Sequence, residues 1–367
     1  MSQELFLAST PLHVLNSVAI ASKTPDKSSC LWLIDQPDVT ENPYFEVLQS
    51  WPDSPFKEVR ISQGHIKGTR AKLQNRKKVF ADIQSWVDRY QPDRVYTGND
   101  RRIEFQYAMH CASQQKKPIS AAYMDEGTFT YVGRKASGSF ADSVVDNTLK
   151  KLTYGFWWKN PPTIGGSAWI DDVYAAFPDL IHPLLKQKQV LDLQSVYEGN
   201  SCVKSFCSYL YERLSGTVGN ISGIQCVLTL PHESIIDRIT GYKDAIQEVV
   251  KQLQYSGLEV GVKYHPRNNN PDILDVKNIK GFHLLPYKVP FEAILPLLPP
   301  DVLVIGDVSS TLINSRWLKP GARLISVAND EAPMYNEFAQ LFSKIDVALT
   351  DAAQLVQLLS SLFETEK

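Results

Sequence analysis

Features that would mark a membrane or nucleic-acid-binding protein are missing from this sequence. No apolar run approaches the ~20 residues that a membrane-spanning helix needs. The first ten residues lack the basic start and the apolar length of a signal peptide. The 38 lysines and arginines are balanced by 40 acidic residues, so no basic surface for a phosphate backbone is expected. We therefore expect a cytoplasmic protein with no nucleic-acid partner and at most peripheral contact with the inner membrane.

Cysteine is scarce, and its spacing excludes a disulfide framework. An odd number of widely scattered thiols does not form such a framework, and no second pair or histidine cluster completes a zinc site. Reduced thiols fit the expected cytoplasmic compartment. The five cysteines are Cys30, Cys111, Cys202, Cys207 and Cys226.

Several common catalytic motifs are also absent. The sequence contains no GxxxxGK[ST] loop, no convincing GxGxxG fingerprint, no HExxH and no GxSxG. It has no Asp-x-Asp flanked by apolar residues, because Asp171 and Asp172 are adjacent rather than spaced. We therefore expect neither a cofactor nor a bound metal. A diphosphate leaving group usually needs a metal or several cations, whereas a single phosphate can leave with help from a histidine and a helix dipole.

Short apolar runs alternate with helical patterns along most of the chain. A length of 367 residues exceeds one usual hydrophobic core, so two domains are expected. Strands are predicted at residues 4–9, 30–34, 58–61, 94–97 and 119–124, then at 224–230, 259–264, 302–305 and 323–327. Helices are predicted at 11–22, 69–90, 104–113, 242–255, 291–298, 310–318 and 351–363. This order predicts an α/β fold of two Rossmann-like, doubly wound parallel sheets.

The domain boundary is predicted from a stretch that lacks clear periodicity. Residues 154–219 contain paired prolines, paired glycines and several Ser/Asn/Gly positions. We assign 1–190 to an N-terminal domain, 191–222 to a junction, 223–345 to a C-terminal domain and 346–367 to a C-terminal helix. Two such domains imply a central cleft, and ligands of open α/β sheets bind beyond the carboxyl ends of the strands.

Two adjacent carboxylates, Asp125 and Glu126, precede Gly127 directly after a predicted strand. A carboxylate at the carboxyl end of a strand, where the sheet has its ligand-binding edge, can take the proton from an attacking hydroxyl group. Successive side chains of an extended chain point to opposite sides, so only one of the two should face the cleft. We favour Glu126 as the base, with Asp125 as its structural partner. An acidic turn that caps the next element is the competing interpretation.

A second candidate follows the strand at 259–264. Pro266 ends that strand and fixes the backbone beside His265. The imidazole can donate to a phosphate oxygen as a nucleotide leaves, and Lys263 and Arg267 add positive charge nearby. A surface histidine before a loop is the alternative. His182 begins another His-Pro pair, but no predicted strand precedes it, so we leave it out of the site.

Two further groups have the chemistry of a nucleotide site. Gly306, Ser309 and Ser310 follow the strand at 302–305 and open a helix, where backbone N–H groups and hydroxyls can bind a phosphate. An ordinary serine cap is the alternative. Glu292 begins a predicted helix and can accept hydrogen bonds from two ribose hydroxyls. In the alternative interpretation, Glu292 is a solvent-exposed residue of the first helical turn whose charge complements the helix dipole.

In their order along the chain, these groups resemble three short signatures of bacterial sialyltransferases in glycosyltransferase families 52, 80 and 38. The signatures are Asp/Glu-Asp/Glu-Gly, His-Pro and Ser-Ser. The matching residues are Asp125-Glu126-Gly127, His265-Pro266 and Ser309-Ser310. The segment Thr10-Pro11-Leu12 looks like the opening of family 52. The aromatic residues at 154–158 match no signature, and they either stack on acceptor sugars or anchor packing.

The resemblance implies a GT-B fold and an inverting, metal-independent transfer from CMP-sialic acid to a hydroxyl of a glycan acceptor, such as a lipooligosaccharide or capsule. It places the base, Glu126 or Asp125, in an acceptor-side N-terminal domain, and it implies that His265 assists the departure of CMP. Whether the acceptor is lipid-linked and whether the protein is a homodimer stay open. The residues assigned to donor binding are Thr10, Gly127, Lys263, Pro266, Glu292, Gly306, Ser309 and Ser310.

Other functions remain compatible with the same residues. Kdo transferases of capsule assembly also use a CMP-sugar, an acidic-Gly element and a His-Pro, so a CMP-Kdo donor is the main alternative. A UDP-sugar transferase of the same fold is the next. A non-catalytic carbohydrate- or nucleotide-binding protein would bind CMP without turnover.

Overall fold

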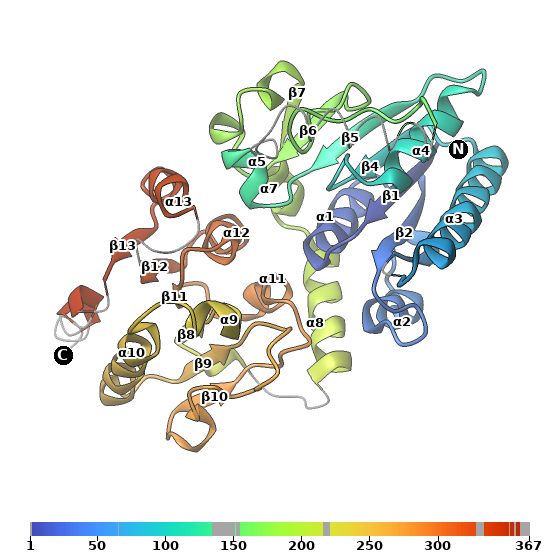
Figure 1. Ribbon diagram of the computed structural model, residues 1–367. Helices are drawn as coiled ribbons and strands as arrows, with labels where there is room; N and C mark the ends of the chain where they lie inside the picture. The colour runs from blue at the N-terminus through green and yellow to red at the C-terminus, as the bar shows by residue number, and fades with distance from the viewer. Residues whose placement is uncertain are drawn as a thin grey trace. The chain divides into compact units, whose positions relative to one another are not determined.

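The chain folds into two compact units, Met1–Tyr209 and Leu210–Lys367, each with its own parallel sheet. The computed structural model (Figure 1) describes residues 2–64, 66–133, 151, 155–215, 221–327, 334–351, 353–355 and 357–359. The division at Tyr209 falls within residues 191–222, where the sequence suggests a junction. Among the described residues, no helix is both long enough and apolar enough to cross a membrane.

The first unit is built on a seven-stranded sheet in the order β3-β2-β1-β4-β5-β6-β7. Every neighbouring pair is parallel, as the strand–helix alternation predicts. The last two strands lie within residues 154–219, where no regular structure was predicted, so that prediction is wrong for them. The strands are β1 (Gln3–Ala8), β2 (Ser28–Gln36), β3 (Phe56–Gln63), β4 (Arg94–Thr97), β5 (Ser120–Met124), β6 (Asp172–Ala175) and β7 (Gln189–Asp192).

Helices connect these strands, and local sequence sets their ends. Thr10 caps the first of them, because its hydroxyl accepts from the His13 N–H at 3.3 Å and Pro11 stands at the first helical position. The fifteen-residue helix α8, which the sequence did not predict, runs across the division at Tyr209. The helices are α1 (Pro11–Ser22), α2 (Pro43–Ser50), α3 (Thr69–Tyr90), α4 (Ile103–Ser113), α5 (Thr128–Val132), α7 (Leu193–Tyr197) and α8 (Ser201–Ser215), with 3-10 turns at Pro178–Leu180 and Leu185–Gln187.

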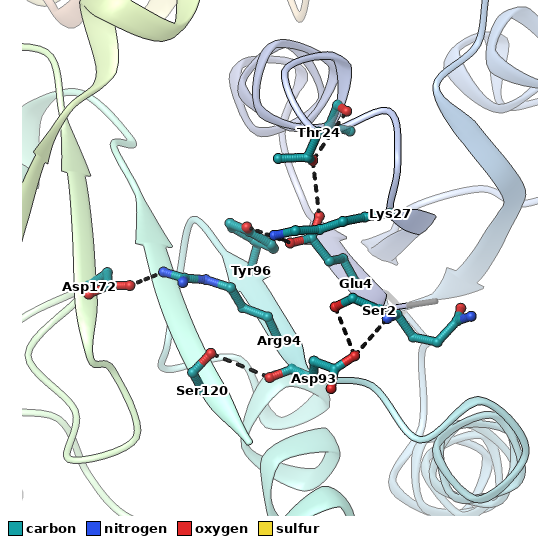
Figure 2. Close-up of polar contacts among 11 residues, drawn as sticks. Ser2, Glu4, Thr24, Lys27, Asp93, Arg94, Tyr96, Ser120 and Asp172 are labelled. Carbon is teal, nitrogen blue, oxygen red and sulfur yellow. Dashed lines mark hydrogen bonds and ion pairs between the residues drawn. The ribbon is translucent and has the colours of Figure 1, made fainter. Parts of the chain in front are cut away.

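A polar network joins the amino ends of the strands in this unit (Figure 2). Glu4 is buried in β1, where it pairs with Lys27 at 2.8 Å and accepts from the Tyr96 hydroxyl at 3.0 Å. Arg94 at the start of β4 pairs with Asp172 at the start of β6. Ligands of open α/β sheets bind at the opposite edge, so this network stabilises the sheet rather than serving a site.

The second unit has a six-stranded parallel sheet in the order β10-β9-β8-β11-β12-β13. Strands β10 and β13 and helices α9 and α13 were not predicted. The strands are β8 (Cys226–Thr229), β9 (Val260–Lys263), β10 (Phe282–Leu284), β11 (Leu303–Gly306), β12 (Arg323–Val327) and β13 (Ala348–Thr350). The helices are α9 (Glu233–Ile236), α10 (Tyr242–Ser256), α11 (Phe291–Ile294), α12 (Ser310–Leu318) and α13 (Tyr335–Phe342), with 3-10 turns at Ile221–Gly223, Val276–Asn278 and Leu295–Leu297.

Two helix predictions in this unit need correction. The helix expected at 291–298 ends at Ile294, because Pro296 removes a backbone donor and only a 3-10 turn follows. The expected C-terminal helix at 346–367 instead opens with strand β13. Residues 353–355 and 357–359 are helical, and Leu355 and Leu359 pack into the core of the second sheet. The rest of the predicted helix at 351–363 lies outside the described residues apart from Asp351.

Candidate active site

Asp125 stands at the carboxyl end of β5 and is almost fully buried. One carboxylate oxygen accepts from the Gly127 N–H at 2.8 Å, and the other accepts from the Ala176 N–H at 2.9 Å and from the Tyr131 hydroxyl. Burial raises the pKa of Asp125, and these donors act against that rise. A carboxylate held by three protein donors is suited to fixing the loop rather than to binding substrate.

Glu126, the next residue, has a half-buried side chain. Its Oε1 accepts from the Phe129 N–H at 3.1 Å in the first turn of α5. Gly127 has φ +95°, a conformation that side chains rarely adopt, so this position of the motif requires glycine. The capping turn considered from the sequence is therefore real, and it orients the one carboxylate of the pair that is not buried.

Helix α1 is tied to the same carboxyl edge. The amide of Asn16 donates to the Asp125 backbone oxygen at 2.8 Å, and the Tyr197 hydroxyl donates to the Asn16 amide oxygen at 2.6 Å. Thr10 lies exposed at the start of this helix. The structure thus places Thr10 in the first unit together with Asp125 and Glu126, whereas the other residues assigned to donor binding, apart from Gly127, belong to the second unit.

Lys263 ends β9 and is buried at 5% exposure. Its ammonium group donates to the backbone oxygens of Tyr264 and Tyr287, each at 3.2 Å. Burial lowers the pKa of Lys263 to about 8, and the nearby carboxylate of Glu292 acts in the opposite direction. Glu292 accepts from the Asn314 amide of α12 at 3.0 Å. The structure therefore brings Lys263, Glu292 and α12 together.

His265 follows β9 and is half-buried, with Pro266 exposed after it. Its Nδ1 accepts from the Arg267 N–H at 3.2 Å, so the ring hydrogen of the neutral imidazole is on Nε2. Burial lowers the pKa of His265 to about 4, with added effects from Arg267, His232 and Lys263. At neutral pH this side chain is a hydrogen-bond donor without a charge.

The other His-Pro pair has a different environment. His182 lies in the first unit, where its backbone N–H donates to the Thr130 oxygen at 2.8 Å. A Cβ atom at Gly133 would lie 2.4 Å from the imidazole, so the ring packs tightly against the end of α5. These contacts give His182 a packing role beside α5.

Ser309 and Ser310 open helix α12 after β11 and are partly exposed. Ser309 occupies the N-cap position with an extended backbone, but its hydroxyl makes no capping hydrogen bond. An ordinary serine cap, the alternative considered from the sequence, is therefore not formed. The hydroxyl can bind a ligand instead.

Gly306 is required by close packing of β11 against β8. A Cβ atom there would lie 2.5 Å from the Thr229 Oγ1 atom, which donates to the Ile305 oxygen at 3.3 Å. We expect Gly306→Ala to lower the free energy of unfolding by about 1–3 kcal/mol in urea denaturation. Adding Thr229→Ala should recover most of that loss, with Thr229→Ala alone as the control. Wild-type stability of Gly306→Ala would contradict this account.

His232, which follows strand β8 of the second sheet, is a site residue that was not predicted from the sequence. The centroid of its ring lies 5.2 Å from the centroid of the His265 ring, and the two ring planes make an angle of 80°. The signal was available, because Pro231-His232-Glu233-Ser234 comes directly after a predicted strand. The contact joins residues far apart in sequence, and the sequence alone did not suggest it.

The aromatic residues at 154–158 divide into different environments. Trp157 stacks on His110 and contacts Phe80 and Tyr107, so it anchors this segment to α3 and α4. Phe156 is 85% exposed. Tyr154 lies outside the described residues. The packing interpretation therefore holds for Trp157.

Metal ligands do not gather in the part of the chain that the structure describes. No group of three His, Cys, Asp or Glu side chains there could hold an ion. Asp171 accepts from the Ala121 N–H at 2.8 Å, and Asp172 pairs with Arg94. Both carboxylates therefore hold the sheet together.

Solved structures resemble this chain in fold. An alpha/beta-galactoside alpha-2,3-sialyltransferase from Photobacterium phosphoreum has a TM-score of 0.56 at 14% identity, covering 96% of this chain and 99% of its own. The UDP-GlcNAc 2-epimerase of Methanocaldococcus jannaschii has a TM-score of 0.55 at 13% identity, and the match covers 98% of this chain and 92% of the epimerase. UGT89C1 of Arabidopsis thaliana complexed with UDP has a TM-score of 0.55 at 11% identity, and the match covers 98% of this chain and 90% of UGT89C1. The predicted α/β fold of GT-B type is confirmed.

Comparison of sequences gives the family. No curated protein matches this chain. The family model of alpha-2,8-polysialyltransferases matches residues 4–328, which include each of the three signatures. The resemblance to bacterial sialyltransferases noted from the sequence is confirmed. The chain belongs to the alpha-2,8-polysialyltransferase family and is a glycosyltransferase of the sialyltransferase type.

Proposed function

We propose that this chain moves sialic acid from CMP-sialic acid to a hydroxyl group of a glycan acceptor, in one displacement that inverts the anomeric centre and needs no metal ion. One observation carries the proposal. In a chain of this family, the acidic pair, the His-Pro pair and the Ser-Ser pair each follow the carboxyl end of a parallel strand, β5, β9 and β11 respectively.

The first unit supplies the base in this proposal. Glu126 takes the proton of the acceptor hydroxyl as that oxygen attacks the anomeric carbon. Asp125 holds the loop through the N–H groups of Gly127 and Ala176. The difference in burial between the two carboxylates supports this division of roles.

The second unit binds the nucleotide. The Nε2–H of His265 donates to the phosphate, whose negative charge grows as the bond to the sugar breaks. Ser309, Ser310 and the first turn of α12 hold the same phosphate. Glu292, with Asn314 on its Oε1, binds the ribose hydroxyls. Lys263 supplies positive charge near the Glu292 carboxylate.

The metal-free mechanism is supported by the chemistry of the leaving group, and the choice of acceptor is supported by the family description. A CMP leaving group carries one phosphate, and histidine and a helix N-terminus can balance its charge without a divalent ion. The family is described as alpha-2,8-polysialyltransferases, so an oligosaccharide that ends in sialic acid is the acceptor to test first.

The test is an assay of CMP or UDP release with three donors, CMP-sialic acid, CMP-Kdo and a UDP-sugar, with a sialylated oligosaccharide as acceptor. We expect turnover with CMP-sialic acid at least about 100-fold above that with CMP-Kdo, because the two donors differ in their sugar contacts. The rate should be the same with and without EDTA. NMR of the product should show that the configuration at the anomeric carbon has inverted.

Different outcomes would identify different errors. Faster turnover with CMP-Kdo would favour a Kdo transferase. Loss of activity in EDTA with recovery in Mg²⁺ would remove the metal-free mechanism. Binding of CMP without release from any donor would favour a non-catalytic nucleotide-binding protein.

A further inference from the structure

Two histidines lie side by side at the carboxyl edge of the second sheet. His232 follows β8 and His265 follows β9, and these strands are neighbours in parallel register. Their rings meet edge to face at 5.2 Å between centroids. The mechanism proposed above uses His265 alone, so the position of His232 needs its own explanation.

Both rings are oriented in the same way by backbone groups. The Ser234 N–H donates to Nδ1 of His232 at 3.1 Å, and the Arg267 N–H donates to Nδ1 of His265 at 3.2 Å. With each Nδ1 accepting, each ring carries its hydrogen on Nε2. Neither Nε2 has a protein hydrogen-bond partner within the described residues. Two donors are thus presented next to each other.

The two loops are also tied to each other. The Glu233 N–H donates to the side-chain oxygen of Asn268 at 3.1 Å, and the Glu233 carboxylate accepts from the N–H groups of Asn269 and Asn270. These bonds fix the spacing of His232 and His265. They also hold the Glu233 carboxylate against the loop amides of Asn269 and Asn270.

The donor in the proposed function has two anionic groups in the same arrangement. The anomeric carbon of a CMP-activated 2-keto sugar acid carries both the phosphate and a carboxylate. We propose that His232 donates from Nε2 to the sugar carboxylate while His265 donates to the phosphate, which makes His232 a specificity-determining residue for carboxylated donors. This inference rests on the proposed function and extends it to the recognition of the sugar.

The experiment compares two substitutions that separate the functions of the ring. His232→Asn keeps an acceptor for the Ser234 N–H but removes the Nε2 donor. His232→Gln keeps a donor near the Nε2 position but loses the cap of α9. We expect His232→Asn to raise the KM for CMP-sialic acid about 10- to 100-fold, because one hydrogen bond to a charged group is lost. His232→Gln should raise it less.

Binding of CMP, which has no sugar carboxylate, provides the decisive comparison. By calorimetry, His232→Asn should bind CMP within about 2-fold of wild type. If CMP binding weakens as much as the KM rises, His232 only positions His265 and the inference is wrong. An unchanged KM in His232→Asn would also overturn it. Inactive wild-type protein with CMP-sialic acid would instead remove the proposed function itself.

Discussion

Replacing Glu126 by Gln should reduce turnover by about 100- to 10,000-fold, the usual contribution of a general base. The amide has nearly the same shape but cannot take a proton from the acceptor hydroxyl. Its oxygen can still accept from the Phe129 N–H, which Glu126 Oε1 does at 3.1 Å. We therefore expect the fold to persist while the chemistry is lost. The measurement is kcat with saturating donor and acceptor, together with urea denaturation.

A second readout separates a base from a structural carboxylate. A general base must be ionised in the free enzyme, so wild-type kcat/KM should fall on the acid side with one titrating group. That limb should be absent from the residual activity of Glu126→Gln. A merely structural glutamate would lower the rate without removing the limb.

Asp125→Asn is the matched control. Its amide can accept only part of the bonds from Gly127, Ala176 and Tyr131 that the carboxylate accepts. We expect a loss of about 1–3 kcal/mol in the free energy of unfolding, which is the cost of leaving one buried donor unsatisfied. The reverse pattern, with Asp125→Asn inactive but stable and Glu126→Gln within a few fold of wild type, would make Asp125 the base.

The sequence predicted the parts of each sheet that are regular and buried. Strands β1, β5, β8, β9 and β11 have apolar cores and clear turn residues after them, so the candidate site residues at their ends could be chosen without coordinates. The strands that were missed, β6, β7, β10 and β13, have only three or four residues each. Strand β7 (Gln189–Asp192) has no buried residue, and β10 and β13 have three residues each, so their pairing depends on the neighbouring strand rather than on their own pattern.

Contacts between residues far apart in the sequence were the other feature that could not be predicted. Alternation along an extended chain predicted that Asp125 and Glu126 would have different surroundings, and their burial does differ. It could not show that Ala176 and Tyr131 donate to Asp125. In the same way, His232 looked like any histidine after a strand until its ring was seen against His265.

His265→Ala should reduce turnover by about 100- to 1,000-fold, as expected for removing one donor to a charge that develops in the transition state. His265→Asn keeps an acceptor for the Arg267 N–H but has no donor at the Nε2 position. His265→Gln places an amide N–H near that position. We therefore expect His265→Gln to retain more activity than His265→Asn, by kcat in the CMP-release assay. The opposite order would contradict donation from Nε2.

The pH dependence tests the charge of the same ring. With a pKa of about 4, His265 in the free enzyme is neutral above that value and gains charge only as the pH falls through it. Between pH 6 and 8, wild-type kcat/KM should therefore show no limb that disappears in His265→Gln. Bound donor brings a phosphate to the ring, and its negative charge favours the imidazolium, so the pKa rises in the complex. A limb that disappears in His265→Gln should then appear in kcat at a higher pH than in kcat/KM. The same limb between pH 6 and 8 in kcat/KM would mean that His265 is already charged before CMP-sialic acid binds.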